Sequence, residues 1–229
     1  MKLPRAFLLL PFFFHLLWSQ EIVDVSISSV SLDSNKGNIK YDSDGEVRSL
    51  RIFRGQRSSN FRYVGPLPIQ FFREEETTNA QGVTEIVRVP IATAHLPGKS
   101  GEFLLVWSKD RDNAGTYLTY AIQENLSDFP AGAFRFLNMA PFDVAVKIED
   151  SVNRLAARAH TDIVLQASAG KNRRATMISL PKDDDSLVVF DGYIKHMPNI
   201  RMLYLIVPQT TGRSGQVKFI SIPQSTRRS

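Results

Sequence analysis

Apolar and polar residues alternate along most of this chain, and this alternation constrains the fold more than any other feature. The pattern is present in Ile22–Ile27 and returns, less regularly, in Val47–Phe53 and Val83–Val89. Successive side chains of a β-strand point to opposite faces, so a period of two is typical of a half-buried strand. Helical periodicity is scarce, and Asp150–Ala159 fits one or two helical turns or a strand equally well. The sequence therefore predicts an all-β protein.

Turn-forming residues divide the first half of the chain into segments. The stretch Asp33–Gly45 is rich in Asn, Asp and Gly and is interpreted as a turn region. A strand is predicted at Pro68–Arg73, followed by an exposed hairpin loop at Glu74–Gly82 that leads into Val83–Val89. A further pair is predicted at Glu102–Trp107 and Thr116–Ile122, joined by the polar turn Lys109–Gly115.

Strand periodicity stops at Asn125–Pro130 and then restarts, which makes this segment the best candidate linker. Seven strands are expected beyond it: Ala133–Leu137, Val144–Ile148, Asp162–Gln166, Ala175–Leu180, Leu187–Phe190, Met202–Val207 and Val217–Ile222. Short strands at this spacing predict an antiparallel β-sandwich.

The chain length allows one large β domain or two smaller ones, and we predict two Ig-like or sandwich domains in tandem. No strict internal repeat is present, although a diverged duplication is conceivable. The predicted division is a signal peptide at 1–20, a sandwich-like domain at 21–124, a linker at 125–130, a second sandwich domain at 131–223 and a flexible tail at 224–229.

Residues 1–20 have the pattern of a secretory signal peptide. Lys2 and Arg5 precede the apolar run Ala6–Trp18, which ends at Ser19-Gln20-Glu21. The run is shorter than the roughly 20 residues that a membrane-spanning helix needs. The chain contains no cysteine, which excludes a disulfide-stapled domain and favours a bacterial envelope protein. We therefore expect an exported protein, periplasmic or secreted, with no membrane span after cleavage.

A resemblance supports this expectation. The segment Pro130–Pro141, Pro-Ala-Gly-Ala-Phe-Arg-Phe-Leu-Asn-Met-Ala-Pro, is followed by Val144-Ala145-Val146. It resembles the opening of exported bacterial β-sandwich modules of unknown function, in which a strand ending in Arg-x-x-Asn precedes an alternating Val-x-Val strand. The resemblance covers roughly 20 residues. It implies a fold and an envelope location, and no activity.

Few patterns in the chain point to metal or anion binding. His95, His160 and His196 are far apart in the sequence, with no ligand spacing. Asp110–Gly115 resembles the start of a calcium loop, but Ala121 stands where a bidentate Glu is needed, so a hairpin turn is the better interpretation. Asp183–Asp185, Lys171–Arg174 and Arg227–Arg228 are interpreted as solvated charges, and nucleic acid is not an expected partner. We predict no metal and no cofactor.

Catalytic patterns are equally scarce. Gly212-Arg213-Ser214-Gly215 lacks the spacing of a nucleophile elbow, and the sequence alone cannot pair Glu85, Glu102 or Asp191 as glycosidase carboxylates. We therefore predict no catalytic residues, and a hydrolase is the weakest of three hypotheses.

The leading hypothesis is a non-catalytic structural or interaction module of the envelope that recognises a protein or polymer through loops or a sheet edge. The alternative is a carbohydrate-binding module, which requires a row of exposed aromatic rings. Phe61, Tyr63, Tyr117 and Tyr193 flank predicted turns and are the side chains whose exposure tests this alternative. The partner is thus an unknown envelope protein or a polysaccharide.

Overall fold

A computed structural model describes residues 21–80, 82–125, 127, 129–163, 172–182, 185–209 and 214–225, with the backbone alone at 160, 162 and 163. The regular structure of these residues consists of β-strands, which confirms the all-β prediction. No described segment forms a helix long and apolar enough to cross a membrane. The predicted signal peptide at 1–20 lies outside the described residues.

The strands fall into two groups of eight, called here the N-terminal half and the C-terminal half. The N-terminal half contains β1 (Ile22–Ser31), β2 (Lys36–Ser43), β3 (Glu46–Ile52), β4 (Phe61–Pro66), β5 (Ile69–Thr78), β6 (Thr84–Ala94), β7 (Glu102–Lys109) and β8 (Tyr117–Gln123). The C-terminal half contains β9 (Phe134–Asn138), β10 (Asp143–Ile148), β11 (Ser151–Leu155), β12 (His160–Ile163), β13 (Asn172–Leu180), β14 (Leu187–Lys195), β15 (Ile200–Pro208) and β16 (Val217–Ser225).

The two halves have the same strand order. The sheets β4-β1-β7-β8 and β3-β2-β5-β6 of the N-terminal half correspond one for one to β12-β9-β15-β16 and β11-β10-β13-β14 of the C-terminal half. The correspondence extends to strand direction, because β1 runs parallel to β7 and β9 runs parallel to β15. The repeat that is absent from the residue pattern is therefore present in the topology.

This strand order departs from two details of the expectation. Two sheets contain one parallel pair each, so the sheets are not purely antiparallel. The order also differs from that of an immunoglobulin domain, whose sheets pair strands as ABED and CFG.

Each half buries its own hydrophobic core between its two sheets. In the N-terminal half, Val25, Ile39, Phe71 and Trp107 belong to one buried cluster that draws on both sheets. In the C-terminal half, residues of β9, β10, β13 and β15 form a second cluster in the same way. These cores fix the two sheets of each half face to face.

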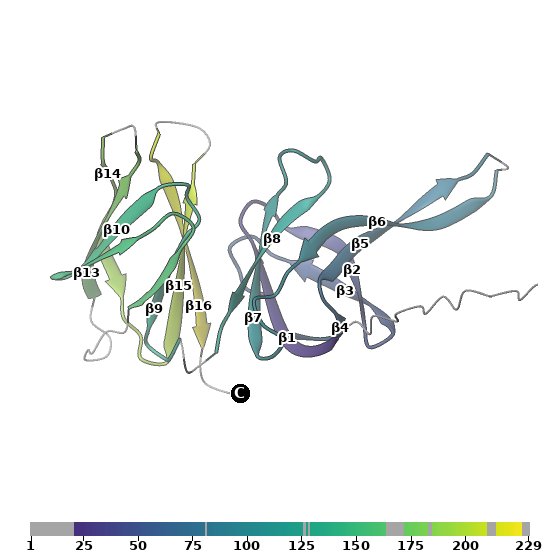
Figure 1. The fold of residues 1–229 in the computed structure, drawn as a ribbon, viewed down its shortest axis with the longest axis horizontal. Helices are drawn as coiled ribbons and strands as arrows, with labels where there is room; N and C mark the ends of the chain where they lie inside the picture. The colour runs from purple at the N-terminus through teal and green to yellow at the C-terminus, as the bar shows by residue number, and fades with distance from the viewer. Residues whose placement is uncertain are drawn as a thin grey trace, which may run out of the picture.

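A third hydrophobic cluster joins the halves. It contains Val30, Leu32, Leu104, Val106 and Ile122 from the N-terminal half and Phe129, Ala133, Leu137, Leu203, Leu205 and Ile222 from the linker and the C-terminal half. The sheets β4-β1-β7-β8 and β12-β9-β15-β16 therefore pack against each other, and both are covered on two faces. The four sheets form successive layers (Figure 1).

The strands in these central sheets have a distinct sequence pattern. Phe103, Leu105 and Trp107 of β7 enter the first core, whereas Leu104 and Val106 enter the junction between the halves. In β15 the corresponding division places Met202, Tyr204 and Ile206 in the second core and Leu203 and Leu205 in the junction. A strand buried on both faces is a continuous apolar run, and both segments have that pattern.

Several boundaries differ from the predicted ones. The predicted turn region Asp33–Gly45 contains β2, whose apolar residues Ile39 and Tyr41 are buried among polar neighbours. The predicted loop Glu74–Gly82 is strand β5 as far as Thr78, and the ambiguous Asp150–Ala159 segment contains strand β11. Strand β16 extends to Ser225, into the predicted tail.

Candidate functional site

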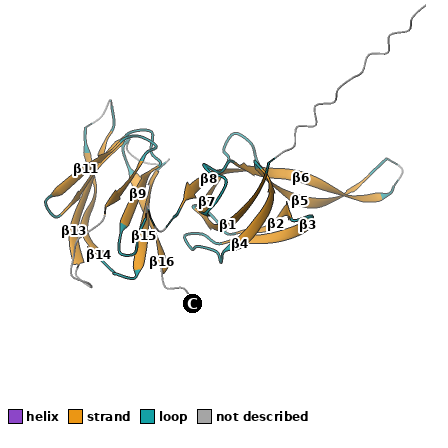
Figure 2. Ribbon diagram, turned by 60° about the horizontal axis from the view of Figure 1, so that its bottom comes forward, coloured by secondary structure: helices purple, strands orange, loops and turns teal. Residues whose placement is uncertain are grey.

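The most exposed feature of the described fold is the outer part of the β5–β6 hairpin, residues 74–78 and 84–88, called here the arm. Strand β2 pairs with β5 only at Lys40↔Phe72 and Tyr41↔Phe71, whereas the β5–β6 pairing continues to Thr78↔Thr84. Beyond Phe72 the hairpin is thus a two-stranded ribbon that projects from the body, away from the C-terminal half (Figures 1 and 2).

The local sequence explains why β2 stops pairing at this point. Asn38 adopts a positive φ of 54°, and the register of the β2–β3 pair shifts between Lys36 and Ile39. Asn tolerates the left-handed conformation better than most residues, and such an irregularity ends a regular ladder. Strand β5 therefore continues without its inner neighbour, and both edges of the arm lack a partner strand among the described residues.

Contacts at the root of the arm hold its direction. Arg88 bonds to Asp42 at 3.0 Å, and its guanidinium lies 4.5 Å from the Phe72 ring centroid. Lys40 pairs with Glu74. These contacts connect the arm to β2, so the ribbon leaves the body in a defined orientation.

The arm exposes apolar side chains and is mainly acidic, with Arg88 at its root as the one basic residue within its bounds. Ile86 is 67% exposed and Val83, in the turn beside it, is 54% exposed. Between Glu74 and Val87 the sequence contains Glu74, Glu75, Glu76 and Glu85 and no Lys, Arg or His. The register places Glu76 opposite Ile86 and Glu74 opposite Arg88, so these four side chains share one face.

A groove of about 400 Å³ lies where the arm leaves the body. It is lined on one side by Asn38, Lys40, Ser49, Leu50 and Arg51 and on the other by Glu74, Glu75, Glu76 and Ile86. The groove thus follows the separation of β5 from β2 and β3. An extended segment placed along the free edge of β5 would lie beside it.

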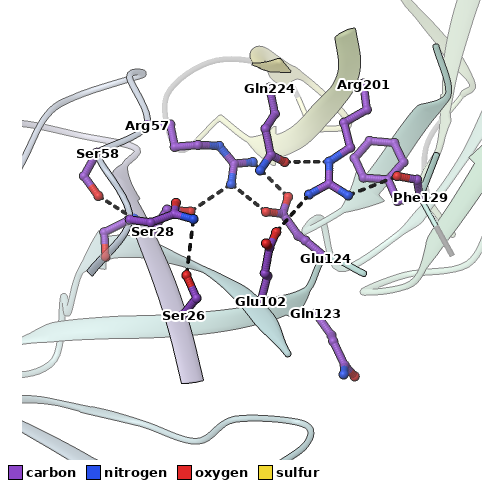
Figure 3. Close-up of polar contacts among 12 residues, drawn as sticks. Ser26, Ser28, Arg57, Ser58, Glu102, Gln123, Glu124, Phe129, Arg201 and Gln224 are labelled. Carbon is purple, nitrogen blue, oxygen red and sulfur yellow. Dashed lines mark hydrogen bonds and ion pairs between the residues drawn. The ribbon is translucent and has the colours of Figure 1, made fainter. Parts of the chain in front are cut away.

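The junction between the halves contains a network of buried charges (Figure 3). Arg57 donates to both carboxylate oxygens of Glu124 at 2.5 and 2.8 Å and to the Ser28 hydroxyl at 2.8 Å. The side chain of Glu124 is 1% exposed and that of Arg57 is 11% exposed. Glu124 directly follows β8, so this pair ties the loop before β4 to the start of the connection between the halves.

Arg201 crosses from the C-terminal half into the same region. Its guanidinium donates to Gln224 Oε1 at 2.6 Å and to the Phe129 carbonyl at 3.0 Å, and it lies 3.7 Å from Glu102. Arg135 and Arg201 both lie over the Phe129 ring, at 4.6 and 5.2 Å. Burial lowers the pKa of Arg201, and nearby Glu124 opposes this shift. The linker residue Phe129 is therefore a packed part of the junction.

The opposite end of the junction opens into a cleft of about 600 Å³. Leu32, Leu118 and Met139 supply apolar lining, and Asp33 lies at the rim. Asp33 accepts hydrogen bonds from the Lys36 ammonium at 2.5 Å and from the Lys109 backbone amide. Burial acts to raise the pKa of Asp33, but the bonds from Lys36, Lys109 and Ser31 outweigh it and the pKa is lowered.

This lowered pKa predicts an acid-dependent contribution of Asp33 to stability. A carboxyl whose folded pKa is depressed stabilises the fold above its unfolded pKa of about 3.9, and this contribution disappears as the pH falls through the folded pKa. Asp33→Asn should therefore be less stable than the wild type near neutral pH, and the difference should shrink towards about pH 2. Denaturant unfolding across this range measures it; a difference that is constant with pH contradicts the assignment.

The histidines are not brought together by the described fold. His95 is exposed at the end of the β6 segment, whereas His196 is 3% exposed with its ring edge on Phe134 at 6.0 Å. The side chain of His160 lies outside the described residues. No group of three His, Asp or Glu side chains in the described part of the chain is arranged to hold a metal ion.

The Asp110–Gly115 segment is a polar hairpin turn. The Asp110 carboxylate accepts bonds from the Asp112 amide at 3.0 Å, from Asn113 Nδ2 at 2.9 Å and from the Thr116 hydroxyl at 3.2 Å. The hydrogen bond from Asn113 is the largest cause of a lowered pKa for Asp110. The Asp110 carboxylate therefore stabilises the turn through hydrogen bonds to residues of the same turn. Asp183 and Asp184 lie outside the described residues.

The remaining charged candidates pair locally and in different places. Glu85 bonds to Asn79, Glu102 lies near Arg201, and Asp191 bonds to Arg174. The three carboxylates are therefore not paired with one another. Within the basic segment Lys171–Arg174, Arg173 pairs with Glu149 and Arg174 with Asp191, while Lys171, Arg227, Arg228, Gly212 and Arg213 lie outside the described residues.

The four aromatic residues chosen for exposure do not form a row. Tyr63 is 2% exposed, and Phe61 and Tyr117 pack against the first core. Tyr193 is 64% exposed, next to Arg174 on the C-terminal half. A sugar-binding platform needs several exposed rings on one face, and this set supplies one.

Two comparisons with known proteins found no match. No family model matches the sequence, and no curated protein matches it either.

Sequence reasoning predicted the β6 side of the arm within the strand Val83–Val89, but it interpreted the β5 side as a loop and missed the junction network. The signal for the β5 side is present in the chain, because Glu74–Thr78 continues the predicted strand Pro68–Arg73 without a proline or glycine. The junction pair Arg57–Glu124 has no comparable signal, since 67 positions separate the two residues.

Proposed function

We propose that this chain is an exported, non-catalytic interaction module of a bacterial envelope, which recognises a protein through the free strand edges of the arm. The observation that carries the proposal is the arm itself: a two-stranded ribbon with open edges and an Ile86 side chain that is 67% exposed. An isolated two-stranded ribbon is only marginally stable in water, and exposed edges are sites where further strands add. Such an element gains stability when a partner pairs with it.

The proposed organisation is two tandem β-sandwich domains of equal topology that act as one body. The repeated strand order supports the division into two domains, and the buried cluster between them supports a fixed relative position. Domains usually move relative to each other unless their interface is large and apolar. A fixed body presents the arm at a constant distance and angle, which suits a recognition element.

Site-specific photo-crosslinking in the native envelope tests this function. A benzophenone amino acid at position 86 should form a discrete protein adduct, because Ile86 faces outward on the arm. The matched control is position 150, an exposed turn residue between β10 and β11. Adducts from position 86 alone support the proposal. Absent adducts, or the same adducts from both positions, contradict it, and an adduct with polysaccharide favours the carbohydrate-binding alternative.

A further inference from the structure

The free edge of β5 in the arm combines two features that indicate a partner. It offers unpaired backbone groups, and acidic side chains lie beside it. Strand β5 pairs with β6 through Thr78, yet its other edge loses β2 after Phe72. Backbone groups on such an edge pair with an added strand, while the side chains on either side determine which sequence is accepted. The flanking side chains therefore indicate the partner.

Those side chains favour cations at alternate positions of the partner. Glu74 and Glu76 project on the face that carries Ile86, and Glu75 projects on the other face. Opposite charges on neighbouring strands stabilise the pair, and like charges destabilise it. Lys40 already pairs with Glu74, and Arg73 lies 3.6 Å from Glu75. A strand with alternating basic residues can add to these contacts and face Glu76.

The groove at the root of the arm provides the apolar component. Leu50 and Ile86 line this groove, together with the polar side chains of Lys40 and Arg51. Ile86 lies on the same face as Glu74 and Glu76, so the aliphatic stems of basic side chains on that face can cover a surface that is 67% exposed in the free protein. The best occupant therefore carries long basic side chains on that face and apolar residues on the other, in an extended conformation.

We propose that the free edge of β5 binds an extended, cationic segment of a partner protein, with basic and apolar residues in alternation, as an added strand. This inference rests on the proposed function, because it names the chemistry of the partner at the same arm. It requires backbone pairing and charge complementarity together. Neither a compact basic domain nor a polysaccharide satisfies both requirements.

Titration calorimetry with synthetic peptides tests the proposal on the full mature chain. The probe is Ac-Lys-Val-Lys-Val-Lys-Val-Lys-NH2. One control peptide replaces each lysine with glutamate, and a second keeps the side chains but is N-methylated at every residue, so that neither of its edges can donate backbone hydrogen bonds. We expect one-to-one binding of the first peptide, weakening with salt, and no measurable binding of either control.

Variants of the arm locate the binding site. The triple variant Glu74→Gln, Glu75→Gln, Glu76→Gln should weaken peptide binding about tenfold, in line with the loss of the two cross-strand charge pairs at Glu74 and Glu76. Ile86→Ser should also weaken binding, whereas Asp150→Asn on the C-terminal half should not change it. Circular dichroism melting verifies that each variant is folded.

Binding that survives the triple substitution, or equal binding of the N-methylated peptide, overturns the proposal. Self-association that blocks the arm, detected by light scattering, also overturns it because the occupant is then a second copy. The crosslinking result distinguishes a failure of the cationic-strand proposal from a failure of the proposed function. A protein adduct at position 86 without peptide binding rejects the cationic strand alone, whereas the loss of both rejects the arm as an interaction site.

Discussion

Glu124→Ala should lower the free energy of unfolding by about 3–5 kcal/mol, because it leaves buried guanidinium groups without their carboxylate. Arg57 makes two hydrogen bonds to Glu124, and the side chain of Arg201, for which Glu124 is also a nearby charge, is 1% exposed. Trp107 is the single tryptophan of residues 21–229 and is fully buried. Its fluorescence during denaturant unfolding measures the effect.

An exposed ion pair provides the matched control. Asp24 and Arg62 form a two-bond pair of similar geometry, at 2.9 and 2.7 Å, with side chains that are 57% and 67% exposed. Water and salt screen such a pair, so Asp24→Ala should have a much smaller effect than Glu124→Ala. If the two substitutions cost the same, Glu124 does not act as a buried counter-charge.

Leu205→Ala should destabilise the protein by about 2–5 kcal/mol, the range for truncating a fully buried leucine. Leu205 is 0% exposed and belongs to the cluster between the halves. The cluster couples the two central sheets, so we expect one unfolding transition for the wild type. In Leu205→Ala this transition should broaden or separate into two. Differential scanning calorimetry measures both effects.

Leu118→Ala is the control for this substitution, because Leu118 lines the cleft but is 57% exposed. A surface substitution of this kind should stay within about 0.5 kcal/mol of the wild type. A melting profile of Leu205→Ala identical to that of Leu118→Ala would show that the central cluster does not couple the two halves.

The strands of the central sheets were the most predictable part of the fold. The runs Phe103–Trp107 and Met202–Val207 are apolar at successive positions, and the structure buries both faces of β7 and β15. The same runs do not reveal that these faces meet each other, because periodicity gives the burial of a strand and not its partner. The packing of the halves therefore needed the three-dimensional structure.

Other elements were hidden by local composition. In β2, Ile39 and Tyr41 are buried, but Asn38 and Asp42 around them have the composition of a turn. The glutamates Glu74–Glu76 suggested a loop, yet the β5–β6 pairing extends through them. Charged side chains are compatible with this strand because residues 74–78 are exposed to solvent. Charge alone does not distinguish an exposed loop from an exposed ribbon.

The sequence suggested the type of candidate site, a sheet edge, but not its location in the chain. A sheet edge is among the recognition surfaces that the sequence suggests, but the particular edge depends on where β2 stops pairing with β5. That stop depends on the left-handed Asn38 and on a register shift. Neither is visible as a motif, so no residue of the arm could be assigned from the sequence.

Hydrogen–deuterium exchange of the mature chain, with and without the lysine–valine peptide, tests the central claim most directly. The claim is that a partner strand adds to the free edge of β5. We expect the amides of residues 74–78 to exchange quickly in the free protein and to be protected by the peptide, while those of β10 remain unchanged. Protection confined to another strand edge, or a saturating peptide that leaves residues 74–78 unprotected, would contradict the claim.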